Sequence, residues 1–158
     1  MNHVEDAIAG RLRVDGVAVL VCAAACGADL LALSAAASLG IRRRIVLPFA
    51  VDVFRERSVV DRPGPPPWGE MYDRFVMEAR ASGDLRLLAL DAGAGDAFET
   101  ANEAILDEAL AVASDRGEPA EAIVVWDASA RTAHDYTEHF AQQAERRGMP
   151  VKSVSILP

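Results

Sequence analysis

The sequence is poor in the residues that build metal centres and disulfide frameworks. It has two cysteines, Cys22 and Cys26, and three histidines, His3, His134 and His139. A disulfide framework needs more cysteines, and a structural zinc site needs about four ligands at suitable spacing, which these residues do not have. We therefore expect no metal site and no cofactor.

Basic residues are also scarce. Sixteen Lys and Arg stand against 24 Asp and Glu, which gives a formal charge of −8. Such a charge repels nucleic acids and anionic membrane surfaces, although three basic residues do cluster in Arg42-Arg43-Arg44. We expect neither nucleic-acid nor membrane binding.

Long apolar runs are absent as well. The longest, 17–28, is too short to cross a bilayer. The first ten residues lack the basic region and apolar core of a signal peptide. These two absences predict a cytoplasmic protein.

The residues that are present predict an α/β fold. The chain has 158 residues, 51% of them hydrophobic, which suits a single domain over 1–158. Short apolar runs predict five strands, and amphipathic or apolar segments between them predict helices. Their alternation predicts a three-layer Rossmann-like domain with a mainly parallel five-stranded sheet and flanking helices. The expected strands are 17–22, 45–47, 85–90, 122–126 and 151–157, and the expected helices are 4–12, 28–39, 70–81, 96–114 and 135–147.

Two further regions complete the prediction. Residues 1–14 hold a helix that precedes the first strand. Residues 50–68, with prolines at 63 and 65–67, form a long loop without regular structure. Loops of this length in compact domains are often functional.

The loop after the first strand is the first candidate site. Ligands of open parallel sheets bind beyond the carboxyl ends of strands, at helix N-termini. Ala25, Cys26 and Gly27 are small enough to let a ligand approach the backbone. Asp29 then accepts a hydrogen bond from a ligand hydroxyl, or only stabilises the helix start. The spacing is not that of the dinucleotide-binding fingerprint.

The loop after the second strand is the next candidate. Pro48 and Phe49 end the strand, and Arg55 and Ser58 follow in the long loop. An aromatic ring here could stack on a base, and an arginine could bind a phosphate. The alternative is a surface loop anchored by Phe49 and Phe54.

Two further candidates lie in the second half of the chain. Asn102 falls on the apolar stripe of a helix, where its amide needs either a backbone partner or a ligand. Trp126 and Asp127 end the fourth strand, and Arg131 could donate to phosphate oxygens. Asp135 and Glu138 fit a helix capping box instead.

The order of these motifs resembles the SLOG superfamily, which includes the Lonely Guy phosphoribohydrolases and the DNA-processing proteins. The resemblance rests on Gly-Ala-Asp at 27–29, Leu-Pro-Phe at 47–49, Ser58-Val59, Asn102 and Val-Val-Trp-Asp at 124–127, and spans roughly 17–157. It implies a Rossmann-like fold and a nucleotide-derived ligand, bound at the sheet edge by Ala25, Cys26, Gly27, Asp29, Pro48, Phe49, Arg55, Ser58, Asn102, Trp126, Asp127, Arg131 and Thr137.

The sequence departs from the active hydrolases of that superfamily. Their Pro-Gly-Gly-x-Gly-Thr-x-x-Glu signature is replaced at 134–140, where Thr137 matches but Phe140 stands in place of the catalytic Glu. An apolar ring cannot transfer a proton. We therefore expect a ligand sensor without ordinary phosphoribohydrolase activity and with no catalytic residues.

Two alternatives stay open at this point. The first is an N-glycosidic-bond hydrolase that uses Asp29, Asp127 or Asp135. The second is a protein-interaction domain with a vestigial pocket, whose partner surface is the proline-rich loop or the first helix. The apolar 28–39 helix also offers a surface for a homodimer.

Overall fold

The structure, a computed structural model, describes residues 2–62, 64–126 and 131–155, with 131–135 by backbone alone. The chain divides into two compact units, Met1–Ala94 and Gly95–Pro158. Each unit has its own parallel sheet and its own helices, and each is described by itself.

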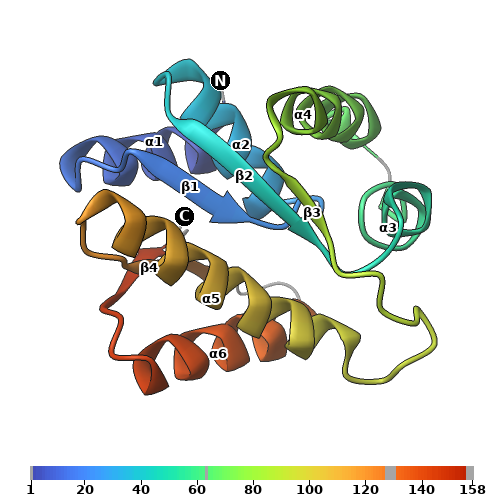
Figure 1. Cartoon of the computed structure of the whole chain (residues 1–158). Helices are drawn as coiled ribbons and strands as arrows, with labels where there is room; N and C mark the ends of the chain where they lie inside the picture. Colours follow the sequence, from blue (N-terminus) through green and yellow to red (C-terminus); the bar gives the residue numbers. More distant parts are fainter. Residues whose placement is uncertain (1, 63, 127–130, 156–158) are drawn as a thin grey trace. The chain divides into compact units, whose positions relative to one another are not determined.

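Unit 1 holds a parallel sheet in the order β1-β2-β3 (Figure 1). Helices α2 and α4 both contact β2 and also contact one another, so they pack on the same face of the sheet. Helix α1 packs on α2, where Ser34 Oγ donates to Glu5 Oε1 at 2.5 Å. The elements are α1 His3–Val14, β1 Val19–Cys22, α2 Ala28–Ser38, β2 Arg42–Leu47, α3 Val51–Ser58, α4 Trp68–Ser82 and β3 Leu85–Leu87.

The core of unit 1 forms where α2 meets the sheet. Leu30 and Leu33 of α2 are fully buried, as are Ile45, Val46 and Leu47 of β2. Helix α2 has almost no polar stripe because α1 covers it on one side and the strands on another. The sheet and α2 therefore fix the position of the loop that joins β1 to α2.

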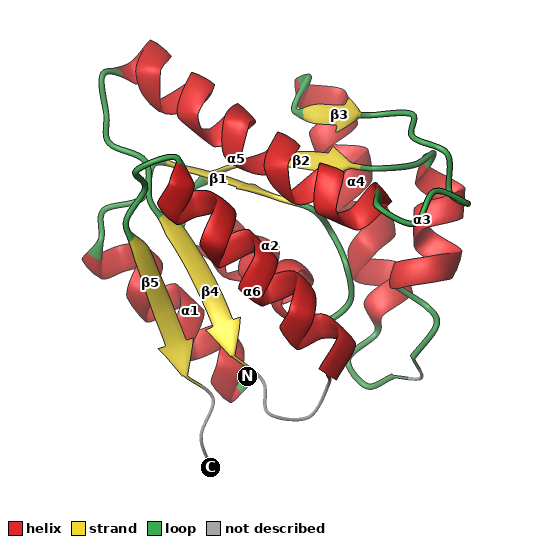
Figure 2. Ribbon diagram, turned by 90° about the horizontal axis from the view of Figure 1, so that it is seen from below, coloured by secondary structure: helices red, strands yellow, loops and turns green. Residues whose placement is uncertain are grey.

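Unit 2 holds two parallel strands and two helices. Strands β4 (Ala122–Trp126) and β5 (Val151–Ser155) pair in parallel along their full lengths and point the same way in Figure 2. Helix α5 (Ala97–Arg116) packs on α6 (Arg131–Arg146), and α6 contacts both strands. The core includes Leu106, Ala122, Ala144 and Met149.

The predicted α/β class with parallel strands is confirmed, and the prediction of one five-stranded sheet is wrong. Parallel strands alternate with helices as expected, but they form sheets of three and two strands and not one sheet of five. Both groups contain short strands, and each group has buried apolar residues in its strands, such as Val46 of β2 and Val154 of β5. The sequence pattern therefore identifies each strand without saying which strands pair, because pairing depends on contacts that are distant in sequence.

The prediction of a long loop over 50–68 is also wrong for its first half, where helix α3 spans Val51–Ser58. This stretch has no glycine or proline, and the residues that break a helix begin only after it. Phe54 gives the helix a fully buried anchor. The N-terminal helix, in contrast, lies where it was predicted.

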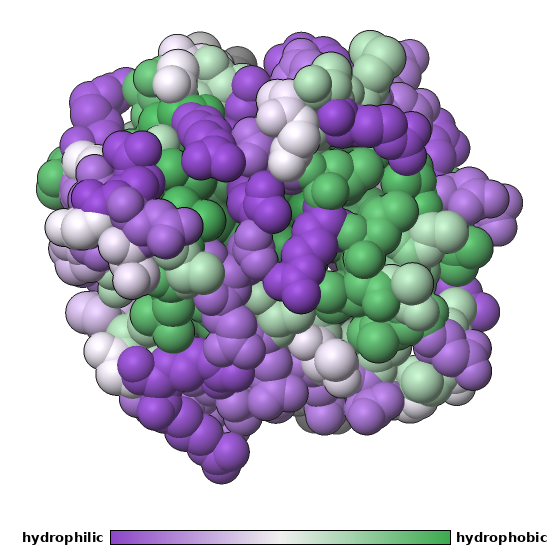
Figure 3. Space-filling model, in the orientation of Figure 1, coloured by the Kyte–Doolittle hydropathy of each residue, from purple (hydrophilic) through white to green (hydrophobic). Residues whose placement is uncertain are grey.

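The surface of the molecule mixes apolar and charged areas. On the face drawn in Figure 3, green apolar areas are interrupted by strongly hydrophilic side chains. Exposed large apolar residues include Val14 and Met77, at 80% and 66%. No helix in the described part of the chain is both long and apolar enough to span a membrane.

Candidate functional site

The loop between β1 and α2 turns on Gly27. This residue has φ +100° and ψ −128°, a conformation that residues with a Cβ rarely adopt. No atom lies within 4 Å of the place where a Cβ would be, so the backbone conformation and not a lack of space requires glycine. The turn leads directly into α2, which begins at Ala28.

The start of α2 leaves three successive amides without an acceptor. Among residues 2–62, 64–126 and 131–155, no hydrogen bond joins the backbone N–H of Gly27, Ala28 or Asp29 to an acceptor. The bonds of the helix begin at Leu30, which donates to the Ala25 carbonyl at 3.3 Å. Ala28 is exposed to solvent. Free amides at a helix N-terminus attract an anion, and this loop can hold one anionic group.

The Asp29 side chain bonds back to the loop that precedes α2. Its Oδ2 accepts a hydrogen bond from the backbone N–H of Ala25 at 3.2 Å. Burial raises the pKa of Asp29 to about 6, against the opposing effect of that hydrogen bond. Burial also raises the pKa of the Cys22 thiol, and the charge of Asp29 adds to the effect. Asp29 can therefore exchange a proton near neutral pH, whereas Cys22 stays a thiol.

The last residue of α3 and the residues just after it lie beside this loop. The backbone N–H of Cys26 donates to the Ser58 carbonyl at 2.9 Å. Cys26 Sγ lies 3.9 Å from Oδ1 of Asp61. Burial and then the Asp61 charge raise the pKa of Cys26, while the charge of Arg62 acts in the opposite direction. Cys26 is therefore a poor nucleophile, and Arg62 is a cation close to the loop.

Sequence reasoning missed Cys22, Asp61 and Arg62 as neighbours of the loop. The available signal was the Asp-Arg pair at 61–62, which ends the segment that follows the second strand. The prolines that follow the pair make the whole segment look irregular in the sequence, and so hide this signal. Once α3 is recognised, the pair falls just beyond the carbonyl of Ser58 that binds the Cys26 amide.

Phe49 and Pro48 lie in the core of unit 1. Both are buried, and Phe49 is 2% exposed. Its ring centroid lies 6.5 Å from that of Phe54, which in turn stacks on Tyr72 at 6.0 Å. The Tyr72 hydroxyl donates to the Val51 carbonyl at 2.7 Å. The Phe49 ring is therefore a packing residue here and presents no open face to a base.

Arg55 is held by α4. Its Nε and Nη2 donate to the two carboxylate oxygens of Asp73 at 2.8 and 3.0 Å. Gly69 makes room for this pair, because a Cβ at that position would lie 2.7 Å from Arg55 Nη2. The guanidinium is thus engaged in joining α3 to α4.

The remaining candidates belong to unit 2. Asn102 Nδ2 donates to the Tyr136 carbonyl at 3.0 Å and lies 3.3 Å from His139 Nδ1, so the amide joins α5 to α6. Trp126 Nε1 donates to Ser153 Oγ at 3.2 Å. Thr137 is half-buried on α6. Asp127 and the side chains of Arg131 and Asp135 lie outside the described residues.

The predicted site residues therefore fall into two groups. The structure brings Ala25, Cys26, Gly27, Asp29 and Ser58 together around the β1–α2 loop of unit 1. It places Asn102, Trp126 and Thr137 on elements of unit 2. No group of three or more His, Cys, Asp or Glu residues suited to a metal ion occurs in the part of the chain that the structure describes.

No protein-family model matches the chain. No curated protein matches it. No solved structure matches it either.

Proposed function

We propose that the chain is a sensor that binds a nucleotide-derived ligand at the β1–α2 loop of unit 1. The observation that carries the proposal is the set of three amides at Gly27, Ala28 and Asp29 that have no acceptor among the described residues. A phosphate of the ligand would accept hydrogen bonds from these amides at the positive end of the α2 dipole. Asp29 would accept from a ribose hydroxyl.

Two other observations support this assignment. The exposed Ala28 and the small residues before it leave the backbone open to a ligand. The Gly-Ala-Asp turn also follows a parallel strand, as in the Rossmann-like domains that the sequence resembles. Arg62, whose charge acts on Cys26, would offset part of the ligand charge.

The experiment combines a ligand screen with a substitution that removes one amide. Nucleotides, nucleosides, cyclic dinucleotides and dinucleotide cofactors are screened by thermal shift against the whole chain. A ligand at a hundred times its Kd adds about 2.7 kcal/mol to the free energy of unfolding, and raises Tm by several degrees.

Ala28→Pro then tests the place of binding. Proline suits the first position of a helix and lacks the N–H, so we expect α2 to form and the affinity to fall about ten-fold or more. His3→Pro is the matched control, because His3 holds the same position in α1. Equal affinity of the Ala28→Pro variant and the wild type would contradict the proposed placement.

One observation favours a second function, an N-glycosidic-bond hydrolase. A carboxyl with a pKa of about 6 can act as a general acid near neutral pH, and Asp29 has this property within the same loop. Incubating the chain with each ligand from the screen should then release free base, and Asp29→Asn should abolish the release but retain binding. Binding without release by the wild-type chain would leave the sensor as the function.

A further inference from the structure

Strand β3 lies at one edge of the sheet of unit 1. The strand order is β1-β2-β3, and in the described part of the chain no strand pairs with the outer edge of β3. The carbonyl of Asp84 and the amide of Leu88 both form hydrogen bonds to β2. Because backbone groups alternate between the two edges of a strand, the N–H and C=O groups of Leu85 and Leu87 point away from β2. These groups are available to a further strand.

This edge is rich in leucine and lies at the surface. Four of the six residues 85–90 are leucines. Leu87 is 44% exposed, and Leu85, Leu88 and Leu90 are half-buried. In Figure 3, which has the orientation of Figure 1, a green apolar area right of the centre lies over β3. An exposed apolar edge strand readily pairs with another strand, so this edge calls for a cover.

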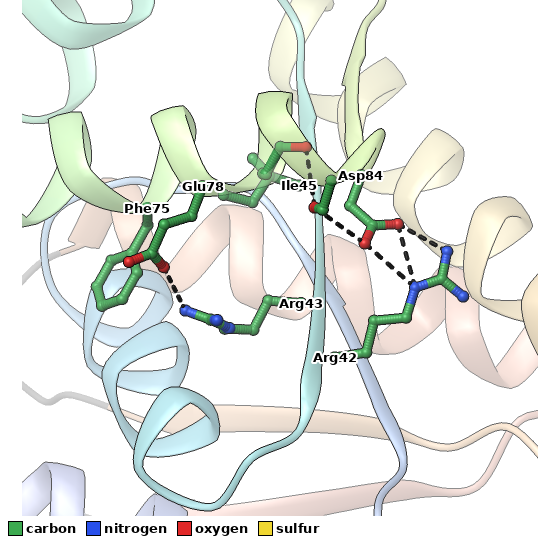
Figure 4. A pocket seen from close by; sticks show the side chains of 8 residues that line it. Arg42, Arg43, Ile45, Phe75, Glu78 and Asp84 are labelled. Carbon is green, nitrogen blue, oxygen red and sulfur yellow. Dashed lines mark hydrogen bonds and ion pairs between the residues drawn. The ribbon is translucent and has the colours of Figure 1, made fainter.

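The strand is also held in place along β2. The Asp84 carboxylate, just before β3, accepts from Arg42 at 2.7 Å (Figure 4) and from Arg44 at 3.3 Å. Leu88, just after β3, donates from its amide to the Leu47 carbonyl at 2.9 Å. Both ends of β3 are therefore bonded to β2. A strand that is already extended loses little conformational entropy when it pairs with another.

The backbone and the side chains of this edge suit a second copy of the same edge. When two such strands pair antiparallel about a two-fold axis at Leu87, each Leu87 exchanges backbone hydrogen bonds with the Leu87 of the other copy. The two exposed leucines then cover one another. Arg86 falls opposite Leu88 of the other copy, so like charges do not meet directly. A parallel pairing in register would instead place the two Arg86 side chains together.

Helix α2, the other apolar element that offers a dimer surface in the sequence, has less of its apolar surface exposed. Its residues Leu30, Leu31 and Leu33 are buried, and α1 packs on it. At β3, in contrast, an exposed apolar side chain and outward backbone groups occur on one residue, Leu87. The edge of β3 is therefore the better surface for a second copy.

We propose that the chain forms a two-fold dimer in which the β3 strands of two copies pair antiparallel, with Leu87 at the axis. This dimer joins the two β1-β2-β3 sheets into one continuous sheet. Because the edge is short, we expect an interface below about 1,200 Å² and a Kd in the micromolar range. The dimer does not depend on the ligand proposed for the Gly27 loop.

Sedimentation velocity of the whole chain, from about 1 to 500 μM, tests for the dimer. We expect the mean mass to rise with concentration towards twice that of the monomer. Added salt should strengthen the dimer several-fold, because the contact is apolar and salt screens the repulsion between two chains of charge −8. A chain that stays monomeric over this range would overturn the proposal, and so would a dimer that salt dissociates.

Substitutions then test whether residue 87 faces its own copy. Leu87→Lys and Leu87→Glu each bring two like charges together, so each variant alone should dimerise about ten-fold or more weakly than the wild type. An equimolar mixture of the two should restore dimers, because the lysine of one copy then meets the glutamate of the other. Val14→Lys is the matched control, since Val14 of α1 is an apolar residue that is 80% exposed.

Three results of these substitutions would overturn the two-fold pairing. The first is a full-strength dimer of the Leu87→Lys or Leu87→Glu variant alone, which would place the interface elsewhere. The second is a mixture of these variants that stays monomeric. The third is an equal loss in the Val14→Lys variant, which would show a general effect of surface charge.

Amide exchange of the wild-type chain tests the pairing even if a Leu87 variant does not fold. When about nine-tenths of the chain is dimeric, the amide of Leu87 should exchange about ten-fold more slowly than in the monomer, because only the monomer exposes it. The Leu88 amide is the internal control and should change little, since it already bonds to the Leu47 carbonyl. Quenched exchange with mass spectrometry, above and below the measured Kd, makes the comparison. Equal exchange of the Leu87 amide at both concentrations would overturn the proposal.

Discussion

At the scale of single residues, the β1–α2 loop depends on a backbone conformation that only glycine adopts easily. Gly27→Ala should lower the free energy of unfolding by about 1–3 kcal/mol, because φ is +100° there. Gly10→Ala is the matched control in the interior of α1, where a Cβ meets nothing within 4 Å. That change should stabilise the protein by about 0.5–1 kcal/mol. Urea denaturation followed by circular dichroism measures both, and effects of the same sign would contradict the argument.

The protonation of Asp29 gives a second prediction at this scale. Its folded pKa of about 6 lies above the ordinary value of 3.8, so the folded state binds the proton more tightly. The unfolded state therefore holds fewer protons between pH 4 and 6, and this group's contribution to stability falls as pH rises through that window. Asp29→Asn removes the buried charge while it keeps an oxygen that can accept from Ala25.

We expect the Asn variant to be more stable than the wild type at pH 7–8, by about 1–3 kcal/mol. The difference should vanish as pH falls below 4, where the wild-type carboxyl is neutral. Urea midpoints of both proteins across this range make the measurement. A difference that does not change with pH would show that Asp29 has no raised pKa in the folded protein.

At the scale of elements, Asp84 joins the start of β3 to β2. Its carboxylate binds Arg42 at 2.7 Å and Arg44 at 3.3 Å, and Ser82 Oγ donates to it as well. The hydrogen bond from Arg42 is the main cause of its lowered pKa. A lowered folded pKa means that the stabilisation is present above the ordinary value of 3.8 and is lost as pH falls through the folded pKa.

Asp84→Asn should therefore lower the free energy of unfolding at pH 7 by about 2 kcal/mol, because the carboxylate is buried and both arginines lose an ion pair with it. The loss should shrink at acid pH, which is the opposite trend to that of Asp29. Glu56→Gln, at an exposed position of α3, serves as the control and should change stability by less than about 0.5 kcal/mol. A loss that persists unchanged at pH 2 would contradict the ionic origin.

The sequence predicts some of these elements closely and misses others. The predicted helices 28–39 and 70–81 end within two residues of α2 and α4, because apolar periodicity and terminal glycines are local signals. Helix α3 is not predicted, because the prolines at 63 and 65–67 favour a loop over the whole segment. Strand β2 begins at Arg42, three residues earlier than predicted, since Asp84 neutralises arginines that look unsuited to a buried strand.

The candidate site was likewise predictable only in part. The Gly27 loop was predictable, because small residues between an apolar strand and a helix are contiguous in sequence. The partners of Arg55 and Asn102 were not, since Asp73 lies 18 residues from Arg55 and Tyr136 lies 34 from Asn102. Whether a polar side chain meets a ligand or a neighbouring element is decided by such distant contacts, which no local pattern contains.

At the scale of the whole molecule, the chain passes from one compact unit to the next through a short exposed segment of small residues. Unit 1 ends at Ala94, and residues 93–96 are exposed. Hydrogen bonds hold the residues just before this segment. Arg57 Nη1 donates to the Ala92 carbonyl at 2.7 Å, and Asp91 Oδ1 accepts from the Gly93 amide. A protease specific for small residues should therefore cut first after Ala94, because small exposed residues lie on both sides of that bond.

Limited digestion with elastase, followed by mass spectrometry, checks this expectation. The two fragments should correspond to 1–94 and 95–158, and the second should retain helical circular dichroism because its core of Leu106, Ala122, Ala144 and Met149 lies wholly within it. Arg57→Gln should extend cleavage to Ala92 by freeing that carbonyl, while Arg62→Gln, the same change nearby, should not. First cleavage within 59–68 would instead show that the segment after α3 opens more readily than the boundary between the units.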